Sequence, residues 1–304
     1  MRSALARLIL PLLMGSALAT SSMAQTPGLS VTTSKTGVVD GVGGGLLTLT
    51  GKSGSEPVTL IAVLGGSEGG YMTSKSSLVM NFLMAGHRVA PIAYHGAKDT
   101  PKHLSEISID AVSSRIAALS KDAGVSPGCV GIVGISKGGE LTLLLASLTD
   151  VGDVHVAITP SDVVWQASNS SLMKKSSWTL SGQPLPFVKY PWFSRATLKA
   201  LRDVSQSGDL HTLAMQKTKD LEPMRIPIEK ATTPVLLQAG TKDELWPTEM
   251  MSKRLMARLA IDKAEHRVEL KAYPMGHFMT QSPKVRTDAG SFLNEALLQS
   301  CPDL

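Results

Sequence analysis

Residues 131–139 read GIVGISKGG, an apolar run that leads into one serine, Ser136, held between Gly134 and Gly138. Glycine weakens regular structure, so it is kept where the backbone turns sharply or where another group must come close. A G-x-S-x-G pattern between a strand and a helix is typical of the nucleophile elbow, a strained turn that presents a serine hydroxyl. The pattern occurs again at 65–69, GGSEG, with Ser67 at its centre. The two copies therefore need different explanations.

Strands and helices alternate on both sides of the elbow. Apolar runs predict strands at 58–64, 87–94, 129–135, 154–158, 234–240 and 267–273. Helices are predicted at 72–86, 105–121, 137–149, 247–260 and 283–299. Apolar strands separated by helices indicate an α/β fold, with a mostly parallel central sheet covered by helices on both faces.

Two segments depart from this alternation. Residues 25–55 are rich in Gly, Ser and Thr and predict a hairpin, with a strand at 45–51. Residues 160–232 show little periodicity and separate two core strands. A long insertion near the carboxyl edge of a sheet usually shapes a site, so we expect a cap at about 160–232.

The first 24 residues have the pattern of a secretory signal peptide. A short basic start, Met1–Arg7, precedes the apolar stretch Leu8–Ala19, and small residues at Ser22 and Ala24 fit a cleavage site. Cleavage after Ala24 is favoured, with Ala19 as the alternative. The apolar stretch is shorter than the about 20 residues that span a bilayer, so no stable membrane anchor is expected. We expect a signal peptide at 1–24, a catalytic domain at 25–304, and a periplasmic or secreted protein.

Charge and cysteine content narrow the possible partners. The net charge of +5 includes two arginines of the signal segment, and no run of Lys or Arg suggests nucleic acid or a membrane surface as a partner. In an exported protein Cys129 and Cys301 can form a disulfide, or can stay as a buried thiol and a free tail thiol. Neither has a neighbouring ligand set, so no metal is expected.

Ser136 has the partners that a nucleophilic serine requires. Asp243 follows the strand at 234–240, and His277 lies just beyond the strand at 267–273. The order Ser, Asp, His, each at the carboxyl end of a strand, fits a triad in which the histidine activates the serine and the acid orients the histidine. Glu244 and Asp162 are rival acids. The other six histidines are expected to be structural: His87, His95, His103, His155, His211 and His266.

Ser67 fits a second role in the same site. A serine hydrolase needs two main-chain N–H donors for its oxyanion, one after the nucleophile and one in a glycine-rich loop at an earlier strand. With Ser136 as nucleophile, these donors are Lys137 and the loop at Ser67 or Glu68. With Ser67 as nucleophile, no loop upstream is available. The Lys137 side chain has no necessary role and is expected to be solvated.

Tryptophans are candidates for the wall of an acyl pocket. Trp246 follows Asp243 closely, and Trp165, Trp178 and Trp192 lie in the expected cap. Trp165 and Trp246 are the named substrate-contact candidates. Plain packing within the cap explains such residues equally well.

The stretch GIVGISKGGELTLLLAS resembles the elbow of the acyl-CoA thioesterase and bile acid-CoA:amino acid N-acyltransferase family, in its C-terminal catalytic domain. SDVVWQ (161–166), SSWTLSGQPLP (176–186), IPIEKATTPVLLQAGTKDELWP (226–247) and YPMGH (273–277) extend the resemblance over roughly 55–300. It implies an α/β-hydrolase fold, with Ser136 as nucleophile, Asp243 as acid and His277 as base. The acyltransferase branch carries cysteine at the nucleophile, so serine favours water as the acyl acceptor.

Two features differ from the animal members of that family. Those enzymes carry a β-sandwich domain before the catalytic one, and about thirty residues after the signal are too few for it. An exported enzyme is also expected to meet cytosolic acyl-CoA rarely. The resemblance therefore predicts the acyl-transfer chemistry rather than the coenzyme A group.

These observations favour an exported serine hydrolase that cleaves a small-molecule acyl ester or thioester through an acyl-enzyme. One alternative is an amidase or peptidase with the same triad. The other is a non-catalytic binding protein with the same fold. No cofactor is implied, and the sequence predicts no oligomeric state.

Overall fold

The computed structural model describes residues 29–51, 58–167, 175–191, 194–262, 268–302 and 304. The expected signal peptide and Trp192 lie outside these residues. The strands are β1 (Ser30–Val39), β2 (Val42–Thr50), β3 (Leu60–Leu64), β4 (Arg88–Ala93), β5 (Ile107–Ser108), β6 (Val130–Ile135), β7 (Val154–Ile158), β8 (Trp178–Leu180), β9 (Gln183–Pro184), β10 (Val235–Gly240) and β11 (Val268–Tyr273). The α-helices are α1 (Ser77–Ala85), α2 (Ile109–Asp122), α3 (Lys137–Leu148), α4 (Arg195–Arg202), α5 (Gly208–Lys217), α6 (Thr248–Asp262) and α7 (Pro283–Ser300). The short 3₁₀ helices are η2 (Val204–Gln206), η3 (Glu222–Met224), η4 (Ile228–Lys230) and η5 (Met279–Gln281).

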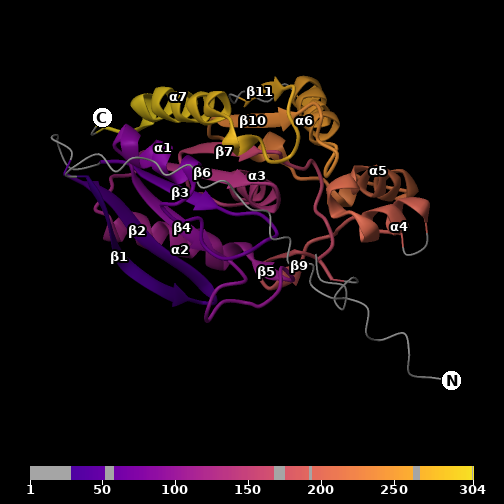
Figure 1. The fold of residues 1–304 in the computed structure, drawn as a ribbon, viewed down its shortest axis with the longest axis horizontal. Helices are drawn as coiled ribbons and strands as arrows, with labels where there is room; N and C mark the ends of the chain where they lie inside the picture. The colour runs from indigo at the N-terminus through magenta and orange to yellow at the C-terminus, as the bar shows by residue number, and fades with distance from the viewer. Residues whose placement is uncertain (1–28, 52–57, 168–174, 192–193, 263–267, 303) are drawn as a thin grey trace.

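The central sheet has the strand order β1-β2-β4-β3-β6-β7-β10-β11 (Figure 1). From β4 to β11 all neighbours are parallel, whereas β1, β2 and β4 pair antiparallel. The mostly parallel sheet and the N-terminal hairpin are thereby confirmed. Because parallel strands end at one edge, the loops after β3, β6, β10 and β11 meet there.

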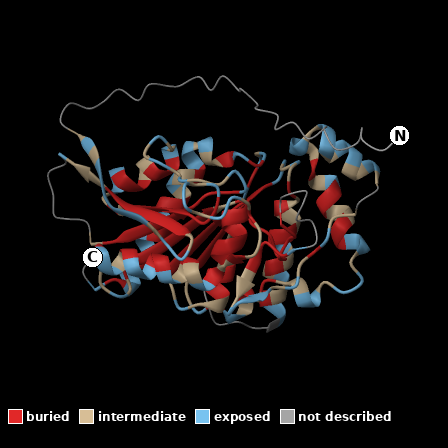
Figure 2. Ribbon diagram, turned by 90° about the horizontal axis from the view of Figure 1, so that it is seen from below, coloured by how far each residue is buried: buried red, intermediate tan, exposed pale blue. Residues whose placement is uncertain are grey.

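Helices cover both faces of the sheet, as the continuous apolar strands indicate. In β3, Ile61 and Val63 pack with α1 and α7, whereas Leu60, Ala62 and Leu64 pack on the side of α2, α3 and α6. This is the alternation of a strand that is buried on both faces. Figure 2 shows the buried residues gathered along the strands and the inward helix sides.

Two helices begin later than the sequence pattern suggests. Helix α1 starts at Ser77 and not at 72, although it ends at Gly86, whose φ of 101° is the left-handed conformation that glycine favours. Helix α2 starts at Ile109 because Ile107–Ser108 instead forms β5, which pairs with β8 about 70 residues later. A local pattern cannot reveal a partner so distant in the sequence.

The segment between β7 and β10 contains α4, α5 and the strands β8 and β9, which form a second small sheet of order β5-β8-β9 with β5 from the chain before α2. Its own apolar cluster includes Val163, Trp165, Val188 and Met215, together with Trp246 from the loop after β10. Helices α4 and α5 lie together at one end of the molecule (Figure 1). The sequence pattern did not reveal either helix.

None of the helices in the described part of the chain is long and apolar enough to cross a membrane.

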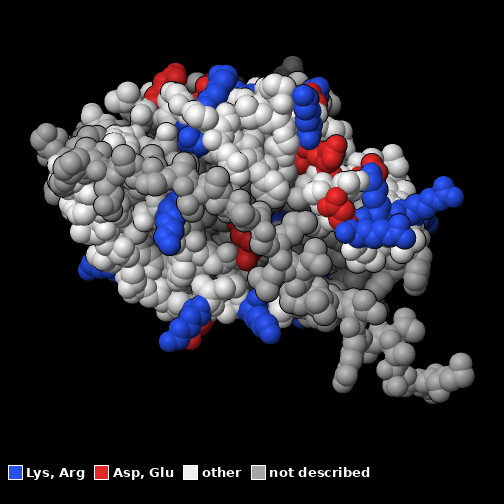
Figure 3. Space-filling model, in the orientation of Figure 1, with Lys and Arg blue, Asp and Glu red and all other residues white. Residues whose placement is uncertain are grey.

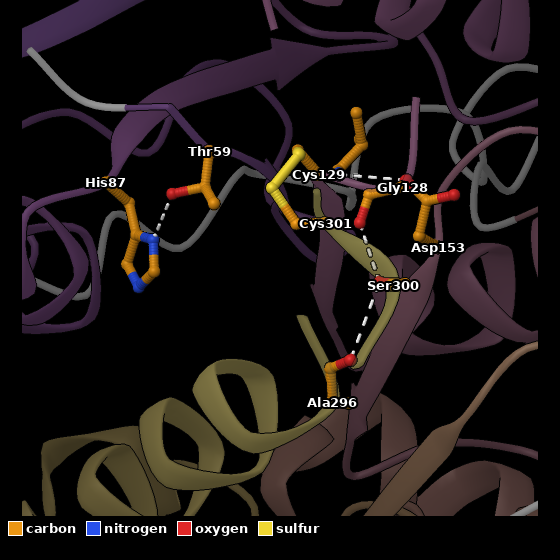
Figure 4. The surroundings of a disulfide bond; sticks show 9 residues. Thr59, His87, Gly128, Cys129, Asp153, Ala296, Ser300 and Cys301 are labelled. Atoms are coloured by element: carbon orange, nitrogen blue, oxygen red, sulfur yellow. Dashed lines mark hydrogen bonds between the residues drawn. A yellow bond between two sulfur atoms is a disulfide. The ribbon is translucent and has the colours of Figure 1, made fainter. Parts of the chain in front are cut away.

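A disulfide joins Cys129, just before β6, to Cys301, just after α7 (Figure 4). The hydroxyl of Ser300 also donates a hydrogen bond of 2.6 Å to the main-chain oxygen of Gly128. The last helix is therefore fastened to the start of the strand that carries Ser136. The bridge closes a loop of 172 residues, and long loops give large losses of unfolded-state entropy.

Replacing Cys301 with serine should lower the free energy of unfolding by about 2–5 kcal/mol, because the unfolded chain regains that entropy. Urea unfolding of the oxidised protein measures the change. Dithiothreitol should destabilise wild type to a similar extent and leave Cys301→Ser unaffected. If dithiothreitol leaves the unfolding midpoint of the wild-type protein unchanged, the disulfide does not form.

Candidate active site

Ser136 occupies a strained turn between β6 and α3. Its φ of 56° and ψ of −117° lie in a region that non-glycine residues rarely adopt and that usually marks a functional site. The turn is held by the Ser136 N–H, which donates to the Ile158 oxygen at 2.9 Å. A Cβ at Gly134 would lie 2.0 Å from the Gly138 oxygen, and one at Gly138 would lie 2.4 Å from the Gly65 oxygen. Both glycines of the pattern are therefore required by close packing around the turn.

His277 and Asp243 form a hydrogen-bonded pair at the ends of β11 and β10. His277 Nδ1 lies 2.8 Å from Asp243 Oδ2, and both side chains are buried. Asp243 also accepts hydrogen bonds from the Trp246 N–H and the Thr248 hydroxyl. Because a carboxylate only accepts, Nδ1 carries the hydrogen of this bond, and Nε2 is the ring nitrogen that does not face Asp243.

The two rival acids have other partners. Asp162 pairs with Arg254 at 2.8 Å, and burial raises the pKa of Asp162. Glu244 accepts the Gly208 N–H at its main-chain oxygen. Asp243 is thus the acid that the fold brings to His277.

Ser136 and His277 are at the same sheet edge, but they make no direct hydrogen bond within the described residues. Trp246 connects them: it lines a pocket with Ser136, and its ring centre lies 6.1 Å from that of His277. Catalytic hydrogen bonds are often long in the absence of substrate and tighten when it binds. Ser136, Trp246 and the His277–Asp243 pair therefore lie near one another at this sheet edge, without a hydrogen bond between Ser136 and His277.

The glycine-rich loop after β3 lies against Ser136. A Cβ at Gly66 would be 3.3 Å from the Ser136 Cβ, and Ser67 lines the pocket together with Ser136 and Lys137. Within the described part of the chain, the main-chain N–H groups of Ser67 and Lys137 have no hydrogen-bond partner. Glu68 does not line this pocket, because its carboxylate turns back to accept the Gly66 N–H at 2.8 Å. Of the two residues, Ser67 is therefore the one that lines the pocket.

The pocket in front of Ser136 has a volume of about 310 Å³ and is mainly apolar. Its apolar wall comes from the insertion and the loop after β10: Ala200, Leu201, Val204, Leu210, Leu245 and Trp246. Trp165 does not line it. The ring of Trp165 is fully buried behind the wall and stacks on Tyr190, with ring centres 5.4 Å apart.

Residues 113–294 match the model of the family described as BAAT / Acyl-CoA thioester hydrolase C terminal. The chain belongs to this family. The suspected relationship is confirmed, and the match contains the elbow, the acid and the histidine.

Curated relatives of this family member include two named thioesterases. The peroxisomal succinyl-coenzyme A thioesterase of Mus musculus is 24% identical over 250 residues, which are 81% of this chain and 55% of that protein. Acyl-coenzyme A thioesterase 1 of Rattus norvegicus is 25% identical over 224 residues, 73% of this chain and 49% of that protein. The chain spans about half the length of the curated relatives it matches.

Solved structures with the same fold are α/β hydrolases. The esterase Pf2001 of Pyrococcus furiosus superposes with a TM-score of 0.58 at 13% identity, covering 88% of this chain and 91% of that one. An acylaminoacyl peptidase of Pyrococcus horikoshii has a TM-score of 0.53 at 12% identity, covering 92% of this chain and 43% of that one. The expected α/β-hydrolase fold is confirmed.

The elbow of this family member also contains a buried ion pair, so the expected solvated Lys137 was wrong. Lys137 is only 4% exposed, and its ammonium donates to Glu140 Oε2 at 2.7 Å and to the Ser177 hydroxyl at 2.9 Å. The ammonium also lies 5.1 Å from the ring centre of Trp178. Burial lowers the pKa of Lys137 and raises the pKa of Glu140, and each charge opposes the shift of the other.

Glu140 joins the elbow to the insertion. Its Oε1 accepts the main-chain N–H of Trp165 at 3.1 Å and the indole N–H of Trp178 at 2.6 Å. The sequence carried one signal for this role, since Lys137 and Glu140 stand three residues apart and so share one side of a helix. The apolar residues that follow them indicated that this helix is buried.

His211 is a second histidine at the pocket, and it is held as a neutral ring. Its Nδ1 donates to the Ser207 oxygen at 2.8 Å, and its Nε2 accepts the Tyr190 hydroxyl at 2.8 Å. Burial lowers the pKa of His211 to about 4. Both ring nitrogens of His211 are therefore occupied, which fits the structural role that the sequence predicts.

Because of His211, the free energy of unfolding should fall at acidic pH, and the His211→Gln variant tests this. Below about pH 6.5 the unfolded chain protonates His211 and the folded chain does not, so stability falls as the pH drops towards 4. The contribution of this residue is about 3 kcal/mol at pH 4. The difference in free energy of unfolding between pH 7 and pH 4 should therefore shrink in His211→Gln. An unchanged difference would argue against a buried neutral ring.

Proposed function

We propose that this chain is a serine hydrolase that cleaves an acyl ester or thioester through an acyl-enzyme. The observation that carries the proposal is the strained Ser136, facing an apolar pocket beside the His277–Asp243 pair. Membership of a family named for acyl-CoA thioester hydrolases supports the same chemistry.

In this mechanism His277 Nε2 takes the proton of Ser136 as the hydroxyl attacks the acyl carbon. The N–H groups of Lys137 and Ser67 stabilise the oxyanion, and the start of α3 adds a favourable dipole. His277 then returns the proton to the leaving alcohol or thiol. Water, activated by the same histidine, releases the acid, while Asp243 stabilises the charged imidazole.

The pocket supports an uncharged, apolar acyl group as substrate. Among the described residues that line it, Lys137 is the one cation, and its charge is already matched by Glu140. A second carboxylate on the acyl chain would be desolvated without a partner, which is costly. We therefore expect a simple fatty acyl group to be preferred over a succinyl group.

A substrate panel tests this function. Thioesters, esters and anilides of butyryl, octanoyl and succinyl groups are compared by kcat/KM, with Ser136→Ala as the blank. Octanoyl thioester or ester should exceed its succinyl counterpart by at least about tenfold, because the pocket removes its methylenes from water. Faster cleavage of the anilide would favour the amidase alternative, and no turnover of any substrate would favour a binding protein.

We also propose that the protein is exported from the cytoplasm, because residues 1–24 have the pattern of a signal peptide. Expression of the full chain in a bacterium should yield a processed protein outside the cytoplasm. N-terminal sequencing should then begin at Gln25. An intact Met1 in the cytoplasm would refute this part alone.

A further inference from the structure

Helix α4 is amphipathic and has no residue buried. Its side chains Leu198 and Leu201 are 58% and 79% exposed, and Val204, in the turn that follows, is 66% exposed. Single exposed apolar residues are ordinary, but a group of three within seven residues at a pocket rim is typical of an interaction site.

Helix α4 carries basic, exposed apolar and pocket-lining side chains on three adjacent sides. At 3.6 residues per turn, Arg195, Lys199 and Arg202 share one side. The two leucines occupy the next side, and Thr197 and Ala200 turn into the pocket of Ser136. Leu201 belongs to both the exposed apolar strip and the pocket wall, so the strip is continuous with the mouth of the pocket. Figure 3 shows Lys and Arg side chains gathered over α4.

We propose that α4 and Val204 form a docking surface for a membrane with anionic headgroups. The leucines would enter the boundary between headgroups and acyl chains, while the basic side chains contact lipid phosphates. The inference rests on the proposed function, because a surface at the pocket mouth would let an amphiphilic acyl substrate pass directly from the lipid into the site. The surface is a reversible contact, not an anchor.

The positive charge of α4 favours an anionic membrane over a second copy of the chain, and its exposed leucines favour a membrane over a soluble anion. A second copy of the chain, docked through the same helix, would bring its arginines against their equivalents. A soluble anion would use the basic side and leave the leucines without a role. Lys199 also pairs with Asp209 at 2.9 Å, but both side chains are largely exposed, and such pairs hold weakly.

The sequence predicts no membrane surface as a partner, because the chain has no run of basic residues. The helix changes this expectation: residues spaced by three and four become neighbours on one side. The basic group therefore exists only in the folded helix.

Co-sedimentation of the full chain with vesicles tests the proposal. Vesicles of phosphatidylcholine with 30 mol% phosphatidylglycerol should bind wild type, and pure phosphatidylcholine vesicles should bind it at least about tenfold more weakly. Leu198→Glu should reduce the binding by about tenfold or more, because one leucine stays in water and a like charge faces the lipid. Leu298→Glu is the matched control, since Leu298 is 65% exposed on α7, a helix apart from α4 (Figure 1).

Equal binding by Leu198→Glu and Leu298→Glu would overturn the proposal, as would no binding by wild type. Dimerisation in sedimentation equilibrium that Leu198→Glu abolishes, without vesicle binding, would replace lipid by a second copy. The Ser136→Ala variant separates this inference from the proposed function. It should bind vesicles like wild type whether or not the wild-type protein turns over any substrate.

Discussion

Replacing Ser136 with alanine is expected to lower kcat/KM for the best acyl substrate by at least about 10⁴-fold. The hydroxyl is the proposed nucleophile, and the turn that presents it contains no second hydroxyl or thiol, since its neighbours are Ile135 and Lys137. The same variant should lose labelling by a fluorophosphonate, which reacts with activated serines. Hydrolysis assays and in-gel fluorescence measure the two effects independently.

Ser67→Ala is the matched control for this experiment. Ser67 lies in the other G-x-S-x-G copy and lines the same pocket, but its proposed contribution is a main-chain N–H that alanine retains. Labelling should therefore persist, with a decrease in kcat/KM of less than about tenfold. If Ser67→Ala loses its label and Ser136→Ala keeps it, the two serines have been assigned in the wrong order.

Replacing Glu140 with alanine is expected to destabilise the fold by about 3–5 kcal/mol. The carboxylate is fully buried, and its loss leaves the Lys137 ammonium without a counter-charge. The N–H groups of Trp165 and Trp178 also lose their acceptor, which is costly for buried donors. Chemical unfolding should give a lower midpoint, and the pocket wall that contacts Trp165 should loosen.

Glu249→Ala controls for the loss of an ordinary ion pair. Glu249 accepts from Lys253 at 2.7 Å on the outer side of α6, and an exposed pair of this kind contributes roughly 0.5 kcal/mol. A second comparison combines Lys137→Met with Glu140→Leu. Removing both charges should recover part of the stability that Glu140→Ala loses. A loss below about 1 kcal/mol in Glu140→Ala would mean that Lys137 finds another partner or loses its charge.

The sheet was predictable because its strands are short apolar runs that are buried on both faces. The prediction for β7 matches the structure residue for residue, β6 and β10 each begin one residue later than predicted, and β11 ends at Tyr273 as predicted. The amino-acid composition of such strands is enough to distinguish them from the segments that flank them. The elbow was equally visible, since Gly134 and Gly138 are required by contacts that any strand-turn-helix of this kind must make.

The insertion was not predictable in the same way. Strand β8 is only three residues long and pairs with β5 about 70 residues earlier, whereas α4 is short and buries none of its residues, so neither stands out in the sequence as a core element. Lys137 was misread for a related reason. Most lysines are solvated. The Lys137 ammonium can be buried only because the folded chain places Glu140, Ser177 and Trp178 around it.

By itself, the sequence determined the parallel sheet, the strained serine and the order of Ser136, Asp243 and His277, because these depend on local pattern and on the rule that parallel strands end at one edge. Only the tertiary structure decided which acid holds the histidine, where Ser67 and Glu68 face, and which tryptophan reaches the pocket. Those outcomes depend on distances between segments far apart in the chain. Contacts of this kind are fixed when the whole core packs, and residue type alone does not specify them.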